Sequence, residues 1–195
     1  MKTTRATRAV KPAKKASTTA PRSARAETSA KGSPKVGSPA PSFSLPADSG
    51  EEVTLARQKG KWVVLYFYPR DNTPGCTREA IAFQGAAAAL KQRGAVVLGV
   101  SRDSITSHCG FKEKQGLRFP LLSDPDSKVH KLYGAYGDKM MYGKKVTGAL
   151  RTTALIAPDG KLARLFSNVK VDGHADAVLA AIDAAKQANA STSRG

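Results

Sequence analysis

The sequence predicts an α/β domain with a central mixed β-sheet flanked by helices, and three observations support this prediction. In the first half of the chain, short apolar runs of strand length alternate with longer helix-like segments. In the second half, two apolar runs are separated by a turn and followed by one more helical segment. The composition changes near residue 36, which marks where the folded domain is expected to begin.

The clearest strand signal is the run KWVVLYFY at 61–68, bounded by Gly60 and Pro69. Because the run is continuously apolar, we expect a strand buried on both faces in the middle of the sheet. The run AVVLGV at 95–100 predicts a second buried strand, and the helix-length sequence between the two implies a parallel, right-handed crossover. Shorter strands are expected at 43–45 and 119–122.

Helices are predicted from their start and stop signals. Thr73 and Pro74 suit an N-cap and a first helical turn, and the Ala-rich sequence after them predicts a helix to about Gln92. A second helix is expected from Ser104 to about Gln115. Further helices are expected at 126–133 and 172–187, whereas the Gly- and Lys-rich residues 134–147 predict a loop.

The last third of the domain begins with a predicted β-hairpin. Residues 152–156 and 161–166 are strand-like and flank the turn Pro158-Asp-Gly160. A βαβα half followed by a hairpin and a helix is the order of a thioredoxin-like sheet. We therefore predict a thioredoxin-like domain over 36–190, with 191–195 as a C-terminal tail.

The N-terminal segment holds much of the chain's charge. Residues 1–35 contain ten lysines and arginines against one acid, Glu27, which gives +9 of the total +17. Since the rest of the segment is mostly Ala, Ser, Thr and Pro, we expect a disordered, solvated tail. Weak contact with nucleic acid through this tail remains open, and so does a role as an organellar transit peptide.

No apolar stretch approaches the length of a membrane span, and the N-terminus lacks the apolar core of a secretory signal. We therefore expect a soluble cytoplasmic protein, or an organellar one if residues 1–35 are a transit peptide. His108, His130 and His174 lack metal-ligand spacing, and no nucleotide-binding loop is present, so we expect no metal and no organic cofactor. His108 is expected to be a solvated helix residue, with assistance to the ionisation of the neighbouring Cys109 as the alternative.

Cys76 is the residue most indicative of chemistry. It would lie in the first turn of a helix, where unpaired backbone N–H groups and the helix dipole favour a thiolate. Buried cysteines are usually inert, but this one follows an apolar strand at the sheet edge where open α/β folds place their sites. A nearby cation would increase its reactivity, and Arg151 at the start of a strand is the candidate.

The segment FYPRDNTPGCTREA at 67–80 resembles the active-site segment of peroxiredoxins, whose pattern is PxxxTxxC. Its TPGCT core is similar to that of the bacterioferritin-comigratory-protein or Q subfamily. The resemblance extends to LLSD at 121–124, GK at 143–144 and GALRTT at 148–153, and covers roughly 36–188. It implies a monomeric thiol peroxidase that reduces hydrogen peroxide and organic hydroperoxides through a sulfenic acid and is regenerated by thioredoxin.

The resemblance also implies roles for individual residues. Cys76 would be the peroxidatic thiol, Pro69 would shield it from solvent, and the Thr73 hydroxyl would hydrogen-bond the peroxide. Arg151 and the Cys76 backbone N–H would stabilise the thiolate and the negative charge that develops on the leaving oxygen. Glu79 would either orient the arginine or be an ordinary acid of an early helical turn.

The second thiol departs from the most common pattern of the subfamily. Many members carry the resolving cysteine five residues after the peroxidatic one, where this chain has Ile81. Others carry it on the later helix, and here Cys109 lies about one turn before the expected position at Lys112. We interpret Cys109 as the resolving thiol, with a passive helix residue as the alternative. A redox sensor or DNA-associated module without turnover is the alternative for the whole protein.

Overall fold

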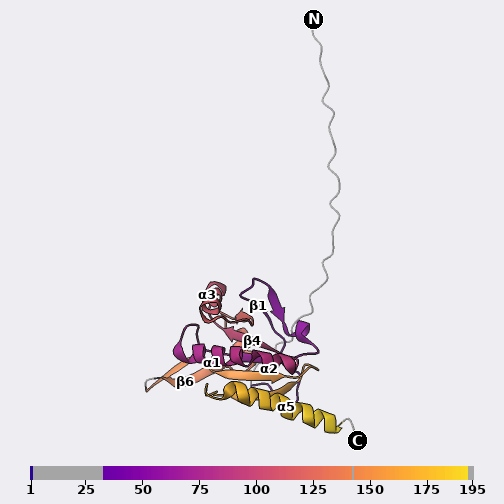
Figure 1. The fold of residues 1–195 in the computed structure, drawn as a ribbon. Coiled ribbons are helices and arrows are strands. Elements are labelled where there is room, and N and C mark those ends of the chain that lie inside the picture. Colours follow the sequence, from indigo (N-terminus) through magenta and orange to yellow (C-terminus); the bar gives the residue numbers. More distant parts are fainter. Residues whose placement is uncertain (2–32, 142, 193–195) are drawn as a thin grey trace.

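The computed structural model describes Met1, residues 33–141 and residues 143–192 (Figure 1). The predicted tail at 1–35 therefore lies outside the described residues except at its two ends. The main sheet has five strands in the order β5-β4-β3-β8-β9. These strands are β3 (Trp62–Phe67), β4 (Ala95–Ser101), β5 (Leu121–Ser123), β8 (Thr152–Ile156) and β9 (Leu162–Ser167).

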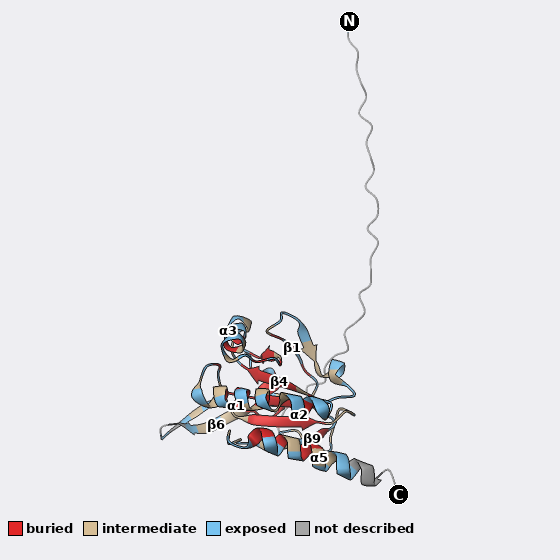
Figure 2. Cartoon of the chain, viewed as in Figure 1, coloured by how far each residue is buried: buried red, intermediate tan, exposed pale blue. Residues whose placement is uncertain are grey.

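The sheet is mixed, as the sequence predicts. Strands β3, β4 and β5 run parallel, whereas β8 pairs antiparallel with β3 and β9 pairs antiparallel with β8. All six residues of β3 are buried, because it lies in the middle of the sheet with packed side chains on both faces. Figure 2 shows the sheet buried beneath helices whose outer faces are exposed.

In the described residues, five α-helices surround the sheet: α1 (Pro74–Gly85), α2 (Ala87–Gln92), α3 (Ile105–Gln115), α4 (Lys128–Leu132) and α5 (His174–Thr192). Alternate β3 residues contribute to two hydrophobic clusters. Val64 and Tyr66 pack with residues of α1, α3 and α5, whereas Leu65 and Phe67 pack with residues of α4. This alternation follows from the two-residue side-chain period of a strand.

Two helix predictions differ from the structure by more than two residues. The helix expected from Thr73 to Gln92 is divided into α1 and α2 at Ala86, where ψ is −5°. Gly85, a poor helix former, directly precedes this junction. Helix α5 continues beyond the predicted Gln187 to Thr192, because neither Gly nor Pro interrupts the sequence there.

The loop prediction for residues 134–147 is wrong. Strands β6 (Tyr136–Met141) and β7 (Lys144–Ala149) form an antiparallel hairpin that extends away from the main sheet (Figure 1). Polar cross-strand pairs stabilise it: Thr147 donates to Asp138 at 2.6 Å, and Lys145 pairs with the same carboxylate at 2.9 Å. Exposed polar pairs of this kind lack the apolar alternation by which strands are predicted.

A second small hairpin joins β1 (Ser44–Pro46) to β2 (Glu52–Thr54) and is followed by the short 3-10 helix η1 (Leu55–Gln58). The sequence indicates β1 but not β2, which has only three residues. None of the helices in the described part of the chain is both long and apolar enough to cross a membrane.

Candidate active site

Cys76 lies where the central strand of the sheet leads into α1. The backbone N–H of Tyr68 still donates to Val100 O on β4 at 3.1 Å, and the chain then turns through residues 69–73. Asn72 takes a left-handed backbone conformation within this turn, with φ of 57°. As predicted, Cys76 occupies the first turn of the helix, and only 2% of its surface is exposed.

Thr73 is the N-cap residue of α1, but its hydroxyl does not cap the helix. Its backbone is extended, with φ of −86° and ψ of 147°, and its side chain donates instead to Arg70 O at 3.1 Å. The oxygen of this hydroxyl can still accept a hydrogen bond from a ligand.

Arg151 is brought to Cys76 from 75 residues away in the sequence. Its Nη2 donates to Cys76 Sγ at 3.4 Å, and its Nη1 donates to Glu79 Oε2 in a short ion pair. The arginine directly precedes β8, and its backbone carbonyl accepts from Val169 N at 3.1 Å. A guanidinium beside sulfur is the arrangement that stabilises a thiolate.

Gly75 makes room for this arginine. A Cβ atom at position 75 would lie 3.2 Å from Arg151 Nη2, closer than most side-chain contacts allow. In the sequence, Gly75 stands only as part of the motif, and no role was predicted for it. Its signal was its place directly before Cys76, since close approach to a backbone is a common reason for glycine.

Glu79 is buried one turn after Cys76, with 1% of its surface exposed. Burial raises its pKa to about 7, although the guanidinium of Arg151 acts in the opposite direction. Its second oxygen, Oε1, has no hydrogen-bond partner among the described residues. Of the two interpretations of Glu79, the geometry favours orientation of Arg151 over an ordinary acid of an early helical turn.

Replacing Glu79 with glutamine is expected to remove a pH dependence of stability. Because folding raises the pKa of Glu79 from 4.5 to about 7, the folded state binds the extra proton between these values. This stabilisation is full below pH 4.5 and is lost as pH rises through 7. Urea denaturation should show Glu79→Gln gaining free energy of unfolding relative to wild type as pH rises from 4.5 to 8. A difference independent of pH would contradict the assignment.

Pro69 is half-buried and lines a cavity of about 430 Å³ between the loop before α1 and the β6–β7 hairpin. Cationic side chains of Arg70, Arg102 and Lys139 border the same cavity. The segment predicted as a loop therefore forms one wall of the space next to the Cys76 loop.

Cys109 lies on α3, apart from the group formed by Cys76, Glu79 and Arg151. Its side chain is exposed and donates to Asp48 O at 3.2 Å, and both cysteines are free thiols. Within the described residues, no hydrogen bond links Cys109 to Cys76, Glu79 or Arg151. The same residues contain no cluster of three or more His, Cys, Asp or Glu side chains placed to hold a metal ion.

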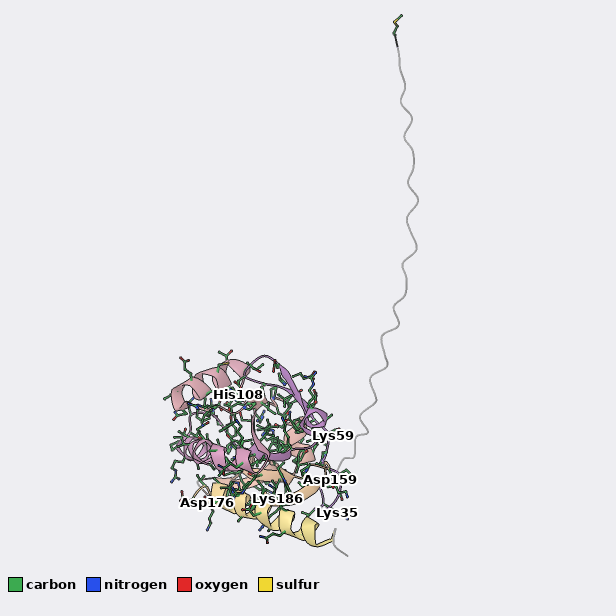
Figure 3. The ribbon with its side chains drawn as sticks, turned by 45° about the vertical axis from the view of Figure 1, so that its right-hand side comes forward. Lys35, Lys59, His108, Asp159, Asp176 and Lys186 are labelled. Carbon is green, nitrogen blue, oxygen red and sulfur yellow. The ribbon has the colours of Figure 1, made fainter. Side chains whose placement is uncertain are left out.

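The prediction of a solvated His108 is wrong. The side chain is fully buried, with Nδ1 2.9 Å from Asp71 Oδ2 and Nε2 3.2 Å from Leu122 O. In Figure 3 it lies within the body of the fold, whereas Lys59 and Asp159 lie at the margin. His108 and buried Phe111 are three residues apart on one face of α3, and this spacing was the available signal.

Comparison with known proteins identifies the family of this chain. The AhpC/TSA family model matches residues 36–165, which is more than half of the chain. The chain belongs to the AhpC/TSA family. Among its relatives, peroxiredoxin Bcp of Xanthomonas campestris is 47% identical over 152 residues, covering 76% of this chain and 95% of the relative. Peroxiredoxin Bcp of Escherichia coli is 42% identical over 145 residues, covering 74% and 93%.

Solved structures of similar proteins agree with the fold. A structure of the Xanthomonas campestris bacterioferritin comigratory protein, described for its alkyl peroxide reduction activity, is 45% identical with a TM-score of 0.69 and covers 73% of this chain and 90% of that one. Peroxidoxin BcpB from Mycobacterium tuberculosis is 34% identical with a TM-score of 0.68, covering 77% and 97%. The thioredoxin-like fold and the resemblance to the Bcp and Q subfamily are confirmed, and the chain is a thiol-dependent peroxidase.

Proposed function

We propose that this peroxidase reduces hydrogen peroxide and organic hydroperoxides at Cys76 and is regenerated through Cys109 by thioredoxin. The observation that carries the proposal is the contact of Arg151 Nη2 with Cys76 Sγ at 3.4 Å in the first turn of α1. It combines a sulfur nucleophile, a fixed cation and the free N–H groups of a helix start in one place.

In the first step, the Cys76 thiolate attacks the terminal oxygen of the peroxide. The O–O bond breaks, the leaving oxygen takes the electron pair and a proton to become water or an alcohol, and Cys76 becomes a sulfenic acid. Arg151 and the Cys76 backbone N–H stabilise the charge on the leaving oxygen, while the Thr73 hydroxyl holds the peroxide. Glu79 orients Arg151, and Pro69 limits the access of water to the sulfur.

Two observations support organic hydroperoxides as substrates. The cavity of about 430 Å³ beside Pro69 offers space next to the Cys76 loop for the organic part of a peroxide. The structurally similar Xanthomonas campestris protein is described as reducing alkyl peroxides.

In the second step, the Cys109 thiol attacks the sulfenic sulfur of Cys76. The S–S bond forms, and the S–O and S–H bonds break to release water. Thioredoxin, a dithiol reductant, then exchanges with this disulfide and restores both thiols. Both sulfurs belong to one chain, which supports a monomer as the working unit.

Replacing Cys109 with serine tests the resolving role. We expect the variant to consume about one peroxide per chain and then to lose most of its thioredoxin-dependent turnover, because the sulfenic acid has no internal thiol to react with. Thioredoxin-coupled peroxide consumption, with mass analysis for an intramolecular disulfide, measures both effects. Unchanged turnover without a disulfide in wild type would mean that an external thiol resolves Cys76. Sub-stoichiometric consumption by wild type would instead support the redox-sensor alternative.

We also propose that the protein works in a reducing compartment such as the cytoplasm, which the two free thiols support.

Residues 1–35, with a net charge of +9, would make weak, sequence-independent contact with nucleic acid. Binding of the full chain to duplex DNA should fall steeply between 50 and 200 mM salt, by about tenfold or more, and vanish when residues 1–35 are deleted. Binding that does not depend on salt would refute this contact.

A further inference from the structure

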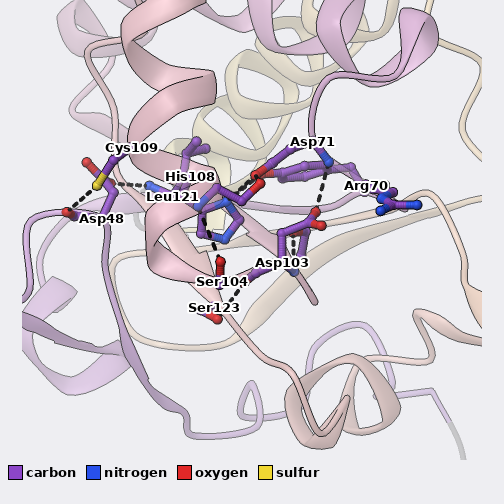
Figure 4. Close-up of polar contacts among 12 residues, drawn as sticks. Asp48, Arg70, Asp71, Asp103, Ser104, His108, Cys109, Leu121 and Ser123 are labelled. Carbon is purple, nitrogen blue, oxygen red and sulfur yellow. Dashed lines mark hydrogen bonds and ion pairs between the residues drawn. The ribbon is translucent and has the colours of Figure 1, made fainter.

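A buried group of polar side chains joins the loop before Cys76 to the helix that carries Cys109 (Figure 4). Asp71 lies five residues before Cys76, while Ser107 and His108 directly precede Cys109. Asp71 Oδ2 accepts from Ser107 Oγ at 2.7 Å and lies 2.9 Å from His108 Nδ1. The two segments that supply the reacting sulfurs are thus connected through one carboxylate oxygen.

Further hydrogen bonds hold Asp71 from the other side. Its Oδ1 accepts from the Tyr68 hydroxyl at 2.8 Å, and its backbone N–H donates to Asp103 Oδ2 at 2.8 Å. Burial raises the pKa of Asp71, but the hydrogen bonds from His108 and Ser107 outweigh this effect and hold the pKa below its usual value. The carboxylate of Asp71 is therefore only 5% exposed, and both of its oxygens have hydrogen-bond partners.

Neither sulfur faces the other in this arrangement. Cys76 is buried against Arg151, whereas Cys109 is exposed and donates to Asp48 O. Consecutive helix residues point about 100° apart, so a rotation of α3 that turns Cys109 inward must pull His108 away from Asp71. Unwinding the first turn of α1 instead displaces the loop that carries Asp71.

We propose that Asp71, Ser107 and His108 form a clamp that must open before Cys76 and Cys109 can join, and that these positioning residues thereby set the rate of the resolving step. The inference rests on the proposed role of Cys109. The step itself needs no further reactant, because the sulfenic oxygen of Cys76 leaves as water with the proton of the Cys109 thiol.

Removing a partner of Asp71 should favour the open state. In the closed state the carboxylate is shielded from water, so a lost donor leaves a buried charge short of hydrogen bonds. In the open state water replaces that donor, and the loss matters little. We expect disulfide formation in His108→Ala to be roughly tenfold faster than in wild type. The first reaction with peroxide should change by less than about twofold, because the clamp touches neither Cys76 nor Arg151.

The chain supplies a matched control in a second buried histidine. His130 on α4 is also fully buried, and its Nδ1 lies 2.7 Å from Asp124 Oδ2. Neither of these residues is close in sequence to a cysteine. His130→Ala therefore reproduces the loss of a buried His–Asp pair and should leave the resolving rate within about twofold of wild type.

Ser107→Ala provides a milder variant in case His108→Ala does not fold. It removes one hydrogen bond to the same Asp71 oxygen from a half-buried position, and we expect a roughly threefold faster resolving step.

The experiment uses the reduced full-length chain mixed with one equivalent of hydrogen peroxide, quenched with an alkylating agent at intervals and analysed by intact mass. We expect faster disulfide formation in His108→Ala and Ser107→Ala but not in His130→Ala, and less sulfinic acid at Cys76 under excess peroxide in the two clamp variants. If wild type forms the disulfide but His108→Ala and Ser107→Ala form it no faster than wild type or His130→Ala, the clamp is refuted while the resolving role of Cys109 stands. If wild type forms no Cys76–Cys109 disulfide, the resolving role of Cys109 fails first, and the clamp with it.

Discussion

Replacing Cys76 with serine is expected to abolish peroxide turnover to the uncatalysed background. A serine hydroxyl stays protonated at neutral pH even beside Arg151, so the variant would lack a nucleophile that the site can ionise. Serine also cannot form a sulfenic acid, so neither the first nor the second step can proceed. Peroxide consumption with thioredoxin or dithiothreitol as reductant measures the loss.

Cys109→Ser is the matched control for this substitution, since it removes the other thiol by the same change. Without added reductant, that variant should still consume about one peroxide per chain, whereas Cys76→Ser should consume none. Continued multiple turnover in Cys76→Ser would mean that Cys109 is the reacting thiol, and the site described around Arg151 would lose its function.

Replacing Arg151 with methionine is expected to lower kcat/KM for peroxide by about 10²–10³-fold, the usual effect of losing a fixed donor to a developing charge. Methionine keeps much of the side-chain volume but supplies neither the donor to Cys76 Sγ nor the partner of Glu79. Arg151→Lys restores the charge but not the two-pronged geometry, and it should recover only part of the lost activity.

Arg93 provides the control for this pair of substitutions. It forms a comparable two-point contact with Asp183, with Nε to Oδ1 and Nη2 to Oδ2 each at 2.8 Å, but it lies outside the site. Arg93→Lys should leave kcat/KM within about twofold of wild type, because this pair is partly exposed. An equal loss in Arg93→Lys and Arg151→Lys would indicate a general effect on folding, and full activity in Arg151→Met would remove the arginine from the mechanism.

The clamp and the Glu79–Arg151 pair act on different steps of the reaction. Arg151 and Glu79 hold the first turn of α1 in the form that reacts with peroxide. Asp71 and His108 hold the preceding loop against α3 in the same form. The Arg151–Glu79 pair would therefore raise the rate of the first step, whereas the clamp would lower the rate of the second.

Several features of this protein were determined by local sequence alone. The apolar run at 61–68 required a buried central strand, and Thr73 and Pro74 placed Cys76 in the first turn of a helix. These predictions succeeded because strand burial, helix starts and turns depend on neighbouring residues. The basic charge of residues 1–35 was evident in the same way, although its role stays a prediction.

Other features were decided only by the tertiary structure. The meeting of Arg151 with Cys76 and Glu79 joins segments far apart in the chain, and the resemblance could suggest it but local patterns could not. The residues around His108 do not indicate that it contacts Asp71 in the interior. The β6–β7 hairpin is stabilised by polar pairs, and in sequence such residues resemble a loop. The physical reason is shared: periodicity reports which face of an element is apolar, whereas a buried polar contact depends on a partner that only the folded sheet brings near.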